Sequence, residues 1–405
     1  MKDDKKVPQL RFPEFTDAWK QRKLCEFVNF YSGLTYKPED VNQIGTFVLR
    51  SSNVKNGEIL DADNVYVNED IAKSEKVQLG DIIVVVRNGS RDLIGKHATV
   101  KRSMPNTVIG AFMTGIRAKE YSFVNALLDT NQFEKEINKN LGATINQITG
   151  YMFSNMSFTI PSEEEQHKIG SFFTQLDNTI TLQQRKLNSL QKLKKGLLQK
   201  MFPKNGENIP EIRFPEFSDA WKQRKVGDLL VERREMVTED NEYPLMAFIA
   251  NEGVAPKGDR FDRSALVKNA DSKKYKRTKY GDFIYSSNNL ESGSIGLNKY
   301  GKASISPVYS IFYPTNLADS DFIGRYFLRK DFIGQMIRWR QGVVYGQWKI
   351  PEADFLNIDI YIPSKDEQEK IGQILDKVDN TITLQQRKLE FLQKLKKGLL
   401  QQMFI

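Results

Sequence analysis

Residues 161–202 read PSEEEQHKIGSFFTQLDNTITLQQRKLNSLQKLKKGLLQKMF, and residues 363–404 read PSKDEQEKIGQILDKVDNTITLQQRKLEFLQKLKKGLLQQMF. A second block also occurs twice, as RFPEFTDAWKQRK from Arg11 and as RFPEFSDAWKQRK from Arg213. Both blocks return after 202 residues, from 11 to 213 and from 161 to 363. A fixed period of this kind indicates a repeated architecture. The chain therefore consists of two halves in tandem, each beginning with the tryptophan block and ending with the long stretch.

The long stretch predicts one uninterrupted helix in each half. Ser162 and Glu165 fit the S-x-x-E capping box, in which the hydroxyl and the carboxylate satisfy free N–H groups of the first turn, and the second copy repeats the motif. Apolar residues then follow at steps of four and three, the spacing of a coiled coil. At about 1.5 Å per residue each helix would be roughly 60 Å long, which suits a spacer. We expect the two helices to pair through Ile169, Phe173, Leu176, Ile180, Leu187, Leu190, Leu197, Ile371, Leu375, Val378, Ile382, Leu389, Leu392 and Leu399.

Polar residues interrupt this apolar seam at equivalent places in the two copies. Gln183 and Lys194 interrupt the first helix, and Gln385 and Lys396 interrupt the second. Polar residues inside a seam weaken it but disfavour other registers, so they support pairing of the two helices within one chain. Each helix also carries a basic face. Four apolar residues of the first helix lie off the seam and predict a partner protein that covers them: Phe172, Leu182, Leu193 and Leu198.

The composition favours a nucleic-acid partner and limits the chemistry. Lys and Arg number 60 against 51 Asp and Glu, and this excess in a chain of 405 residues points weakly to a polyanion. The single cysteine, Cys25, excludes a disulfide framework and a CxxC metal site. The opening MKDDKK lacks the apolar core of a signal peptide, and no apolar run approaches 18 residues. We expect a cytoplasmic protein.

Two segments of unlike sequence, roughly 24–160 and 226–362, lie between the repeats. Each has a Gly-Asp turn and an apolar strand (IIVVVR from Ile82, FIYSS from Phe283), then a polar loop that contains glycine. A further strand is predicted at 107–117 and at 303–313, and a helix at 122–141, stopped by Gly142, and at 320–341, stopped by Gly342. A last strand ends at a proline, SFTIP or DIYIP. The fold class is therefore α+β, with two mixed domains of similar plan joined by two long helices.

The tryptophan blocks admit two interpretations. Phe12, Phe15 and Trp19 in the first block, repeated in the second, could stack on bases. Such aromatic residues more often anchor a chain end to its own domain, and we favour that structural role.

A search for catalytic chemistry finds none. The two histidines are His97 and His167, and the second half has Glu369 in place of His167. The segment from Gly89 to His97, GSRDLIGKH, has one residue too many for a phosphate loop and lacks the Ser or Thr that would hold Mg²⁺, so it predicts a polar hairpin. No spaced acidic set resembles a metal nuclease site, and no Asn-Pro-Pro-aromatic methylation motif is present. We therefore predict no catalytic residue, no metal site and no cofactor bound by this chain.

Polar and basic clusters in the two unlike segments are the candidates for contact with DNA. Arginine and lysine can bond guanine edges, asparagine and glutamine can bond adenine, and further lysines neutralise phosphates. For any one residue a solvated surface is the simpler explanation, but the clusters together favour DNA. The candidates are Arg50, Asn53, Lys55, Arg87, Asn88, Ser90, Arg91, Lys273, Lys274, Lys276, Arg277, Asn288, Asn289, Arg338, Arg340, Gln347 and Trp348.

The chain resembles the specificity subunits of type I restriction-modification enzymes over essentially its whole length. The segments that carry the resemblance are IPSEEEQHKIG or IPSKDEQEKIG, followed by DNTITLQQRKL and LKKGLLQ, twice at the ends of divergent domains. The resemblance implies two target recognition domains that each read half of a bipartite, asymmetric site on double-stranded DNA. It also implies antiparallel helices that set the spacing and bind two modification subunits. S-adenosylmethionine, ATP and Mg²⁺ are then expected on the modification and restriction subunits.

The resulting division of the chain is a loose N-terminus (1–7), recognition domain 1 (8–160), the central repeated helix (161–202), a linker (203–209), recognition domain 2 (210–362) and the C-terminal repeated helix (363–405). Two other functions remain open at this point. One is a stand-alone DNA-nicking or cleaving enzyme with a cryptic site, and the other is a structural coiled-coil adaptor that does not contact DNA.

Overall fold

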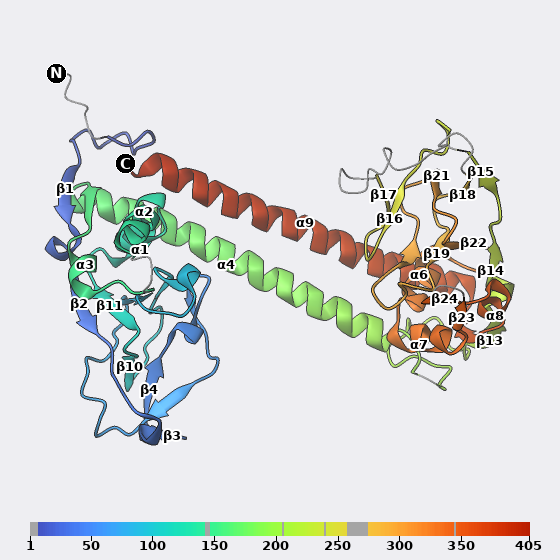
Figure 1. The fold of residues 1–405 in the computed structure, drawn as a ribbon, viewed down its shortest axis with the longest axis horizontal. Helices are drawn as coiled ribbons and strands as arrows, with labels where there is room; N and C mark the ends of the chain where they lie inside the picture. The colour runs from blue at the N-terminus through green and yellow to red at the C-terminus, as the bar shows by residue number, and fades with distance from the viewer. Residues whose placement is uncertain (1–6, 142–145, 205, 239, 257–273, 344–345) are drawn as a thin grey trace. The chain divides into compact units, whose positions relative to one another are not determined.

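The computed structural model describes residues 7–141, 146–204, 206–238, 240–256, 274–343 and 346–405. The chain forms two compact units (Figure 1). Unit 1 contains Met1–Arg185 and Gln386–Ile405, and unit 2 contains Lys186–Gln385. Each unit thus combines one α+β region, which we call its mixed domain, with part of both long helices.

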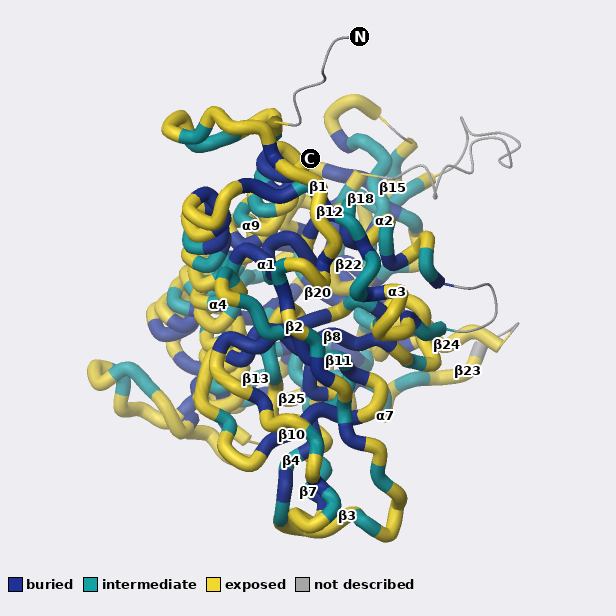
Figure 2. Tube along the Cα trace, turned by 90° about the vertical axis from the view of Figure 1, so that its left-hand side faces the viewer, coloured by how far each residue is buried: buried dark blue, intermediate teal, exposed yellow. Residues whose placement is uncertain are grey.

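The mixed domain of unit 1 is built on a four-stranded antiparallel sheet. Its order is β2 (Asn29–Ser32), β11 (Met113–Arg117), β8 (Ile82–Val85) and β9 (His97–Thr99). All four residues of β8 are buried, as Figure 2 shows along β8 and β11, which explains its unbroken apolar sequence. β8 and β9 are antiparallel neighbours, so the polar hairpin predicted from Gly89 to His97 is confirmed.

A second sheet of unit 1 contains a parallel pair. Its order is β10 (Thr107–Ile109), β4 (Thr46–Leu49), β7 (Val65–Val67) and β3 (Val41–Asn42), with β10 parallel to β4. Two smaller pairs complete the unit: β1 (Lys20–Lys23) with β12 (Ser157–Ile160), and β5 (Val54–Lys55) with β6 (Glu58–Ile59). The closing strand SFTIP is therefore confirmed as β12. Short 3-10 turns lie at Leu24–Glu26 (η1), Pro38–Asp40 (η2), Ser51–Asn53 (η3) and Arg91–Leu93 (η4).

Unit 2 repeats the central sheet and changes the periphery. The repeated order is β14 (Leu230–Glu232), β22 (Ser310–Pro314), β19 (Phe283–Tyr285) and β20 (Ile295–Leu297), and β13 (Lys222–Lys225) pairs with β25 (Asp359–Ile362) as β1 does with β12. The second sheet has three strands, β15 (Met236–Val237), β18 (Tyr275–Thr278) and β21 (Ala303–Ile305). Two hairpins are added: β16 (Ala247–Ile249) with β17 (Gly253–Ala255), and β23 (Gln341–Val343) with β24 (Gln347–Lys349).

Several expected elements are divided in the structure. The helix expected at 122–141 is two helices, α1 (Tyr121–Leu128) and α2 (Asn131–Asn140), because the Thr130 hydroxyl accepts a hydrogen bond from the Phe133 N–H and caps a new helix. The helix expected at 320–341 is α6 (Ser320–Phe327) and α7 (Lys330–Arg338), and Gln341 already belongs to β23. The single strands expected at 107–117 and 303–313 are each two strands in different sheets. Short helices complete the list: α3 (Gly150–Ser154), α5 (Val226–Leu229) and α8 (Glu352–Leu356).

The two repeated stretches form the long helices α4 (Glu163–Lys200) and α9 (Lys365–Met403). In unit 1 the Phe173 ring contacts the Phe404 ring at 6.1 Å, and Lys396 pairs with Asp177 at 2.5 Å. Residue numbers rise along α4 as they fall along α9, so the helices are antiparallel. In unit 2 the Lys194 ammonium lies 2.7 Å from the Asp379 carboxylate, with the same direction of pairing. The predicted antiparallel pair is confirmed, and every predicted seam residue is buried or half-buried.

The lysines that interrupt the seam are therefore partners of aspartates on the opposite helix. Of the four off-seam residues, only Leu182 and Leu193 are exposed. Phe172 and Leu198 are half-buried against the cores of their own units, so the prediction that all four need a partner is wrong for these two. None of the described helices combines the length and the apolar content needed to cross a bilayer.

A repeated glycine lets each long helix approach its mixed domain closely. A Cβ atom at Gly170 would lie 2.5 Å from the backbone nitrogen of Phe123, at the start of α1. A Cβ atom at Gly372 would lie 3.0 Å from the carboxylate of Asp319, which caps α6. Only glycine permits the approach at Gly170 without a backbone shift.

The tryptophan blocks are structural anchors, as favoured from the sequence. Trp19 and Trp221 are 3% and 2% exposed, and their rings meet those of Phe404 and Phe202 edge to face. The Arg11 guanidinium donates two hydrogen bonds, of 2.8 and 2.7 Å, to Glu165. The expected capping box is therefore wrong in one part, because this carboxylate binds an arginine of the tryptophan block.

The hydroxyl part of the box is present in the second copy, where Ser364 accepts a 3.4 Å hydrogen bond from the Glu367 N–H. The residue just before each tryptophan block also bonds the end of a long helix. The Leu10 N–H donates to the Gln402 carbonyl at 2.9 Å, and the Ile212 N–H donates to the Lys200 carbonyl at 2.8 Å. Each block thus joins the start of one long helix to the end of the other.

Candidate nucleic-acid interface

In unit 1 a polar and aromatic patch forms at the loop after β8. The Arg87 guanidinium lies 5.0 Å from the centre of the Phe112 ring, which is 50% exposed. The Asn88 amide donates a 3.1 Å hydrogen bond to the Ser51 hydroxyl, which joins this loop to η3. We call Arg87, Asn88, Ser51 and Phe112 the unit 1 patch. It combines a cation, an amide and a flat apolar face, the groups that contact phosphates and bases.

Two candidate residues of unit 1, Arg50 and Asn53, bind the neighbouring loop at Ala62 and Asp63. Asn53 is fully buried, and its amide donates to the Ala62 carbonyl at 2.7 Å while its oxygen accepts from the Arg50 N–H at 2.9 Å. The Arg50 guanidinium pairs with Asp63 at 2.5 Å. This placement argues against a base contact by Asn53, whereas Lys55, Ser90 and Arg91 are exposed.

In unit 2 three segments converge beside the loop after β19. The Trp348 N–H donates a 2.5 Å hydrogen bond to the Asn288 side chain, and the Ile350 N–H donates to the Ser287 hydroxyl at 2.9 Å. The Arg340 guanidinium pairs with Glu291 at 3.0 Å and lies 5.9 Å from the Trp348 ring. Trp348 is 48% exposed, and Gln347 and Asn289 are exposed.

We call Asn288, Asn289, Arg340, Gln347 and Trp348 the unit 2 patch. The end of α7, the β23–β24 hairpin and the loop after β19 supply its residues. All five residues were candidates from the sequence, but the hairpin that presents Gln347 and Trp348 was not predicted. The run of β-branched and aromatic residues between Gln341 and Lys349, interrupted by Gly346 at a φ of 68°, carried that signal.

The basic cluster around β18 belongs to a different part of unit 2. The Lys276 ammonium donates to the Tyr309 carbonyl at 2.9 Å, and burial lowers the pKa of this lysine. Arg277 pairs with Glu235 and Asp240, each at 3.6 Å, and its guanidinium lies 4.4 Å from the Tyr243 ring centre. These contacts give both residues structural roles. Lys274 is exposed, and Lys273 lies outside the described residues.

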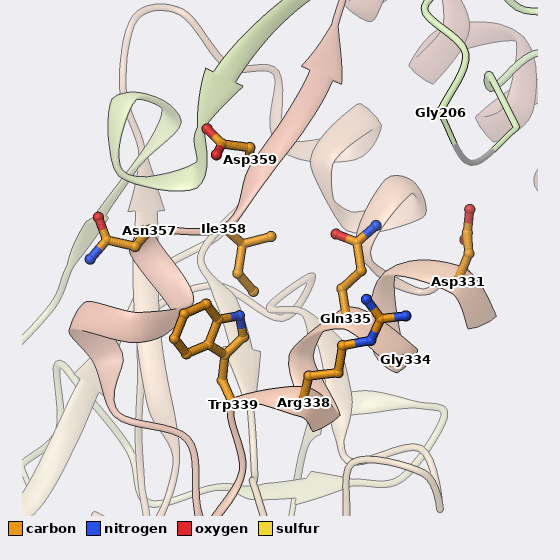
Figure 3. Close-up of a pocket in the computed structure, with 9 residues that line it drawn as sticks. All are labelled: Gly206, Asp331, Gly334, Gln335, Arg338, Trp339, Asn357, Ile358 and Asp359. Carbon is orange, nitrogen blue, oxygen red and sulfur yellow. The ribbon is translucent and has the colours of Figure 1, made fainter.

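Arg338 contacts different neighbours from Arg340. It lines a cavity of about 860 Å³ together with Gln335, Trp339 and Asn357, and Figure 3 shows Arg338 and Gln335 extending from the same helix, α7. The linker residue Gly206 also borders this cavity. Arg338 is exposed but is not a member of the unit 2 patch.

Each of the two histidines contacts a carboxylate. His97 is buried, its Nε2 lies 3.4 Å from the Asp129 carboxylate, and its Nδ1 lies 3.0 Å from the Gly95 carbonyl. His167 is exposed and lies 3.1 Å from Glu120. Across the described ranges, no group of three or more His, Cys, Asp or Glu residues could hold a metal ion.

Comparison with known proteins then decides the family. The family profile described as "Type I restriction modification DNA specificity domain" matches residues 16–192 and again residues 218–394. The two matches cover most of the chain and coincide with the two repeats. This chain belongs to the type I restriction-modification specificity family.

Two curated members of the family are similar over part of their length. The StySPI specificity subunit of Salmonella potsdam is 23% identical over 229 residues, which cover 53% of this chain and 49% of that protein. The EcoKI specificity subunit of Escherichia coli K12 is 26% identical over 177 residues, which cover 40% of this chain and 38% of that protein. The aligned region thus spans about half the length of these relatives or less.

The fold of the family extends over the whole chain. The crystal structure of the type I restriction-modification S subunit from M. genitalium has a TM-score of 0.61 and 14% identity, with 98% of this chain and 99% of that chain covered. At this identity the likeness establishes the specificity-subunit fold alone. The two patches lie on the mixed domains, where the two repeats of this family member differ in sequence.

Proposed function

We propose that this chain is the DNA-reading, non-catalytic subunit of a type I restriction-modification complex. The observation that carries the proposal is the pairing of an arginine with a half-exposed aromatic ring on each of two unlike domains, beside the loop that follows the corresponding strands β8 and β19. In unit 1 the pair is Arg87 and Phe112, and in unit 2 it is Arg340 and Trp348. Two similar pairs that come from different elements and flank different polar residues suit two readers of different sequences.

The expected target is a bipartite, asymmetric site on double-stranded DNA, with one half read by each domain. Arginine can bond guanine and glutamine or asparagine can bond adenine, while exposed lysines such as Lys55 and Lys274 neutralise phosphates. The two half-sites would lie about one helical turn apart, roughly 34–36 Å. The expected location is with the chromosome in the cytoplasm.

Two modification subunits are the proposed partners of the long helices, with restriction subunits joining them. Leu182 and Leu384, at equivalent positions of α4 and α9, are 62% and 65% exposed, and Leu193 and Leu395 are 49% and 40% exposed. The same apolar residues are thus exposed in both repeats, which suits two copies of one partner. S-adenosylmethionine, ATP and Mg²⁺ are expected on the partners.

The experiment maps methylated adenines in DNA from cells with and without this gene. A bipartite methylated motif that disappears with the gene supports the proposal, and an unchanged methylation pattern contradicts it. Inserting a second TITL after Leu182 should then lengthen the unspecified gap and leave both half-sites unchanged. Cleavage of DNA by the purified chain alone with Mg²⁺ would contradict the non-catalytic role.

A further inference from the structure

The long helices carry the same charge pair in both units. In unit 1, Lys396 of α9 lies 2.5 Å from Asp177 of α4. In unit 2, Lys194 of α4 lies 2.7 Å from Asp379 of α9. The period of 202 residues relates Lys194 to Lys396 and Asp177 to Asp379. Each mixed domain therefore faces the same lysine and aspartate on the helices, which we call the frame pair.

The mixed domain of unit 1 adds an acid to the frame pair. Asp129 lies between α1 and α2, and its carboxylate is 2.6 Å from the Lys396 ammonium. The other carboxylate oxygen of Asp129 faces His97. The side chains of Lys396, Asp129 and Asp177 are 17%, 31% and 24% exposed, so water screens these contacts only in part.

The mixed domain of unit 2 adds a cation, an arginine, to the frame pair instead. Arg325 of α6 binds Asp376 and also lies 3.1 Å from Asp379, and its side chain is 13% exposed. The Lys299 ammonium reinforces this contact at 3.3 Å from Asp376. α1 and α6 are both eight residues long. Counted from the first residue of each helix, Ala126 of unit 1 is the equivalent of Arg325. By the same count Leu328 of unit 2 is the equivalent of Asp129. The two domains therefore contact the frame pair from different positions and with side chains of opposite charge.

The apolar contacts constrain the domain angle less sharply than ion pairs do. The long helix packs against α1 or α6 where Gly170 or Gly372 allows a close approach, but hydrophobic burial is non-directional. A partly buried ion pair with two carboxylates depends strongly on direction, because a small displacement leaves charges unpaired. Arg325 and Asp129 are the residues of the two mixed domains that provide this directional contact with the frame pair.

We propose that Asp129 and Arg325 are positioning residues that fix the angle of each recognition domain on the helices, and thereby the gap at which the two half-sites are read. The repeated frame pair accepts a domain of either charge, since it offers a cation and an anion side by side. This inference rests on the proposed DNA-reading function. Neither residue is assigned a contact with DNA.

The test compares Arg325→Met, which removes the charge, with Arg325→Lys, which keeps it. Each variant is purified with the modification subunits and measured for binding to duplexes that carry the mapped target with its natural gap, or with the gap changed by one base pair. The discrimination is the ratio of binding to the natural gap and to the changed gap. We expect this ratio to fall about tenfold in Arg325→Met and to stay close to the wild-type value in Arg325→Lys. Discrimination against a mutated base within either half-site should remain unchanged, because the patches are intact.

Lys302→Met is the matched control, because Lys302 pairs with Glu242 in the same unit with both side chains more than half exposed. Asp129→Asn applies the same test to unit 1, with Asp129→Glu as the charge-conserving variant. If Arg325→Met does not fold, unit 1 decides: a loss of gap discrimination in Asp129→Asn that Asp129→Glu does not share supports the proposal, and wild-type discrimination in a folded Asp129→Asn overturns it. Wild-type discrimination in a folded Arg325→Met overturns it, whereas a wild-type complex that ignores the gap overturns the proposed function itself.

Discussion

The Arg213 guanidinium donates two hydrogen bonds of 2.7 Å to the Glu367 carboxylate, which is 1% exposed. Arg11 and Glu165 form the same arrangement in the other unit. The pair raises the pKa of Arg213 through its hydrogen bonds with Glu367, which outweigh the effect of burial. The start of each long helix is thus joined to the tryptophan block through a buried charge pair.

Replacing Arg213 by Met should lower the stability of unit 2 by about 3–5 kcal/mol, because it leaves a buried carboxylate unpaired. The double variant Arg213→Met with Glu367→Leu should recover most of this loss, because no charge is then left buried. Urea unfolding followed by tryptophan fluorescence measures both effects. The control Lys370→Met removes an exposed pair with Glu216 and should change the stability little, because water screens exposed charges.

Substitutions in the two patches should affect different halves of the target. Arg87→Ala should weaken selection within one half-site, and Gln347→Ala within the other, by about 1–3 kcal/mol for each base that the side chain no longer bonds. Competition binding with duplexes mutated in one half-site at a time measures this selection. Lys119→Ala removes an exposed lysine of unit 1 that pairs with Glu163 and should leave both selections intact. Equal weakening at both half-sites would argue against separate readers.

The exposed leucines of the long helices should matter to the partner and not to the fold. Leu182→Lys and Leu384→Lys should each reduce binding of one modification subunit by tenfold or more, since apolar interface residues can contribute about 2 kcal/mol or more. The unfolding midpoint should stay unchanged, because both side chains are exposed. Gln386→Lys, at an exposed position of α9, serves as the control in sedimentation of the assembled complex.

The contact of His97 with Asp129 should make unit 1 sensitive to pH. Burial alone would lower the pKa of His97, but the Asp129 carboxylate and the Gly95 carbonyl raise it overall. A raised pKa means that protonated His97 contributes stability below its unfolded value of about 6.5, and that this contribution is lost as the pH rises through the folded value. The pKa of Asp129 is lowered by His97 and Lys396 in spite of burial, so its contribution is lost as the pH falls below about 4.

Unit 1 should therefore be more stable near pH 6 than at pH 9, and His97→Gln should remove most of this difference. The urea midpoint followed across this range measures the effect. If the urea midpoint of the wild type is as high at pH 9 as at pH 6, His97 does not contribute to the stability of unit 1.

The sequence predicted the two long helices much better than the two patches that we propose contact DNA. The repeat and the seam could be predicted because a periodic apolar pattern leaves few alternatives over about 40 residues, and the antiparallel direction was implied by the resemblance to the specificity subunits. The ends of the shorter helices could not be predicted in this way, because local capping hydrogen bonds determine where these helices begin and end. Thr130 stops and restarts a helix that periodicity alone predicts as continuous.

The candidate DNA residues show the limit of composition as a guide. Asn53 and Arg277 have the residue types that contact DNA, yet tertiary contacts occupy both. Phe112 was missed because a single phenylalanine carries no signal until the fold brings it beside Arg87. The partners of Lys194 and Lys396 were not predicted either, although their positions in the seam were.

The division of the chain into units also affects the order in which they fold during synthesis. Unit 2 is one continuous segment, Lys186–Gln385, whereas the core of unit 1 contains Leu400, Met403 and Phe404 from the end of the chain. Domains generally fold as units while the chain emerges from the ribosome. The part of the chain made first is therefore completed last, since the core of unit 1 closes only when its final residues have been translated.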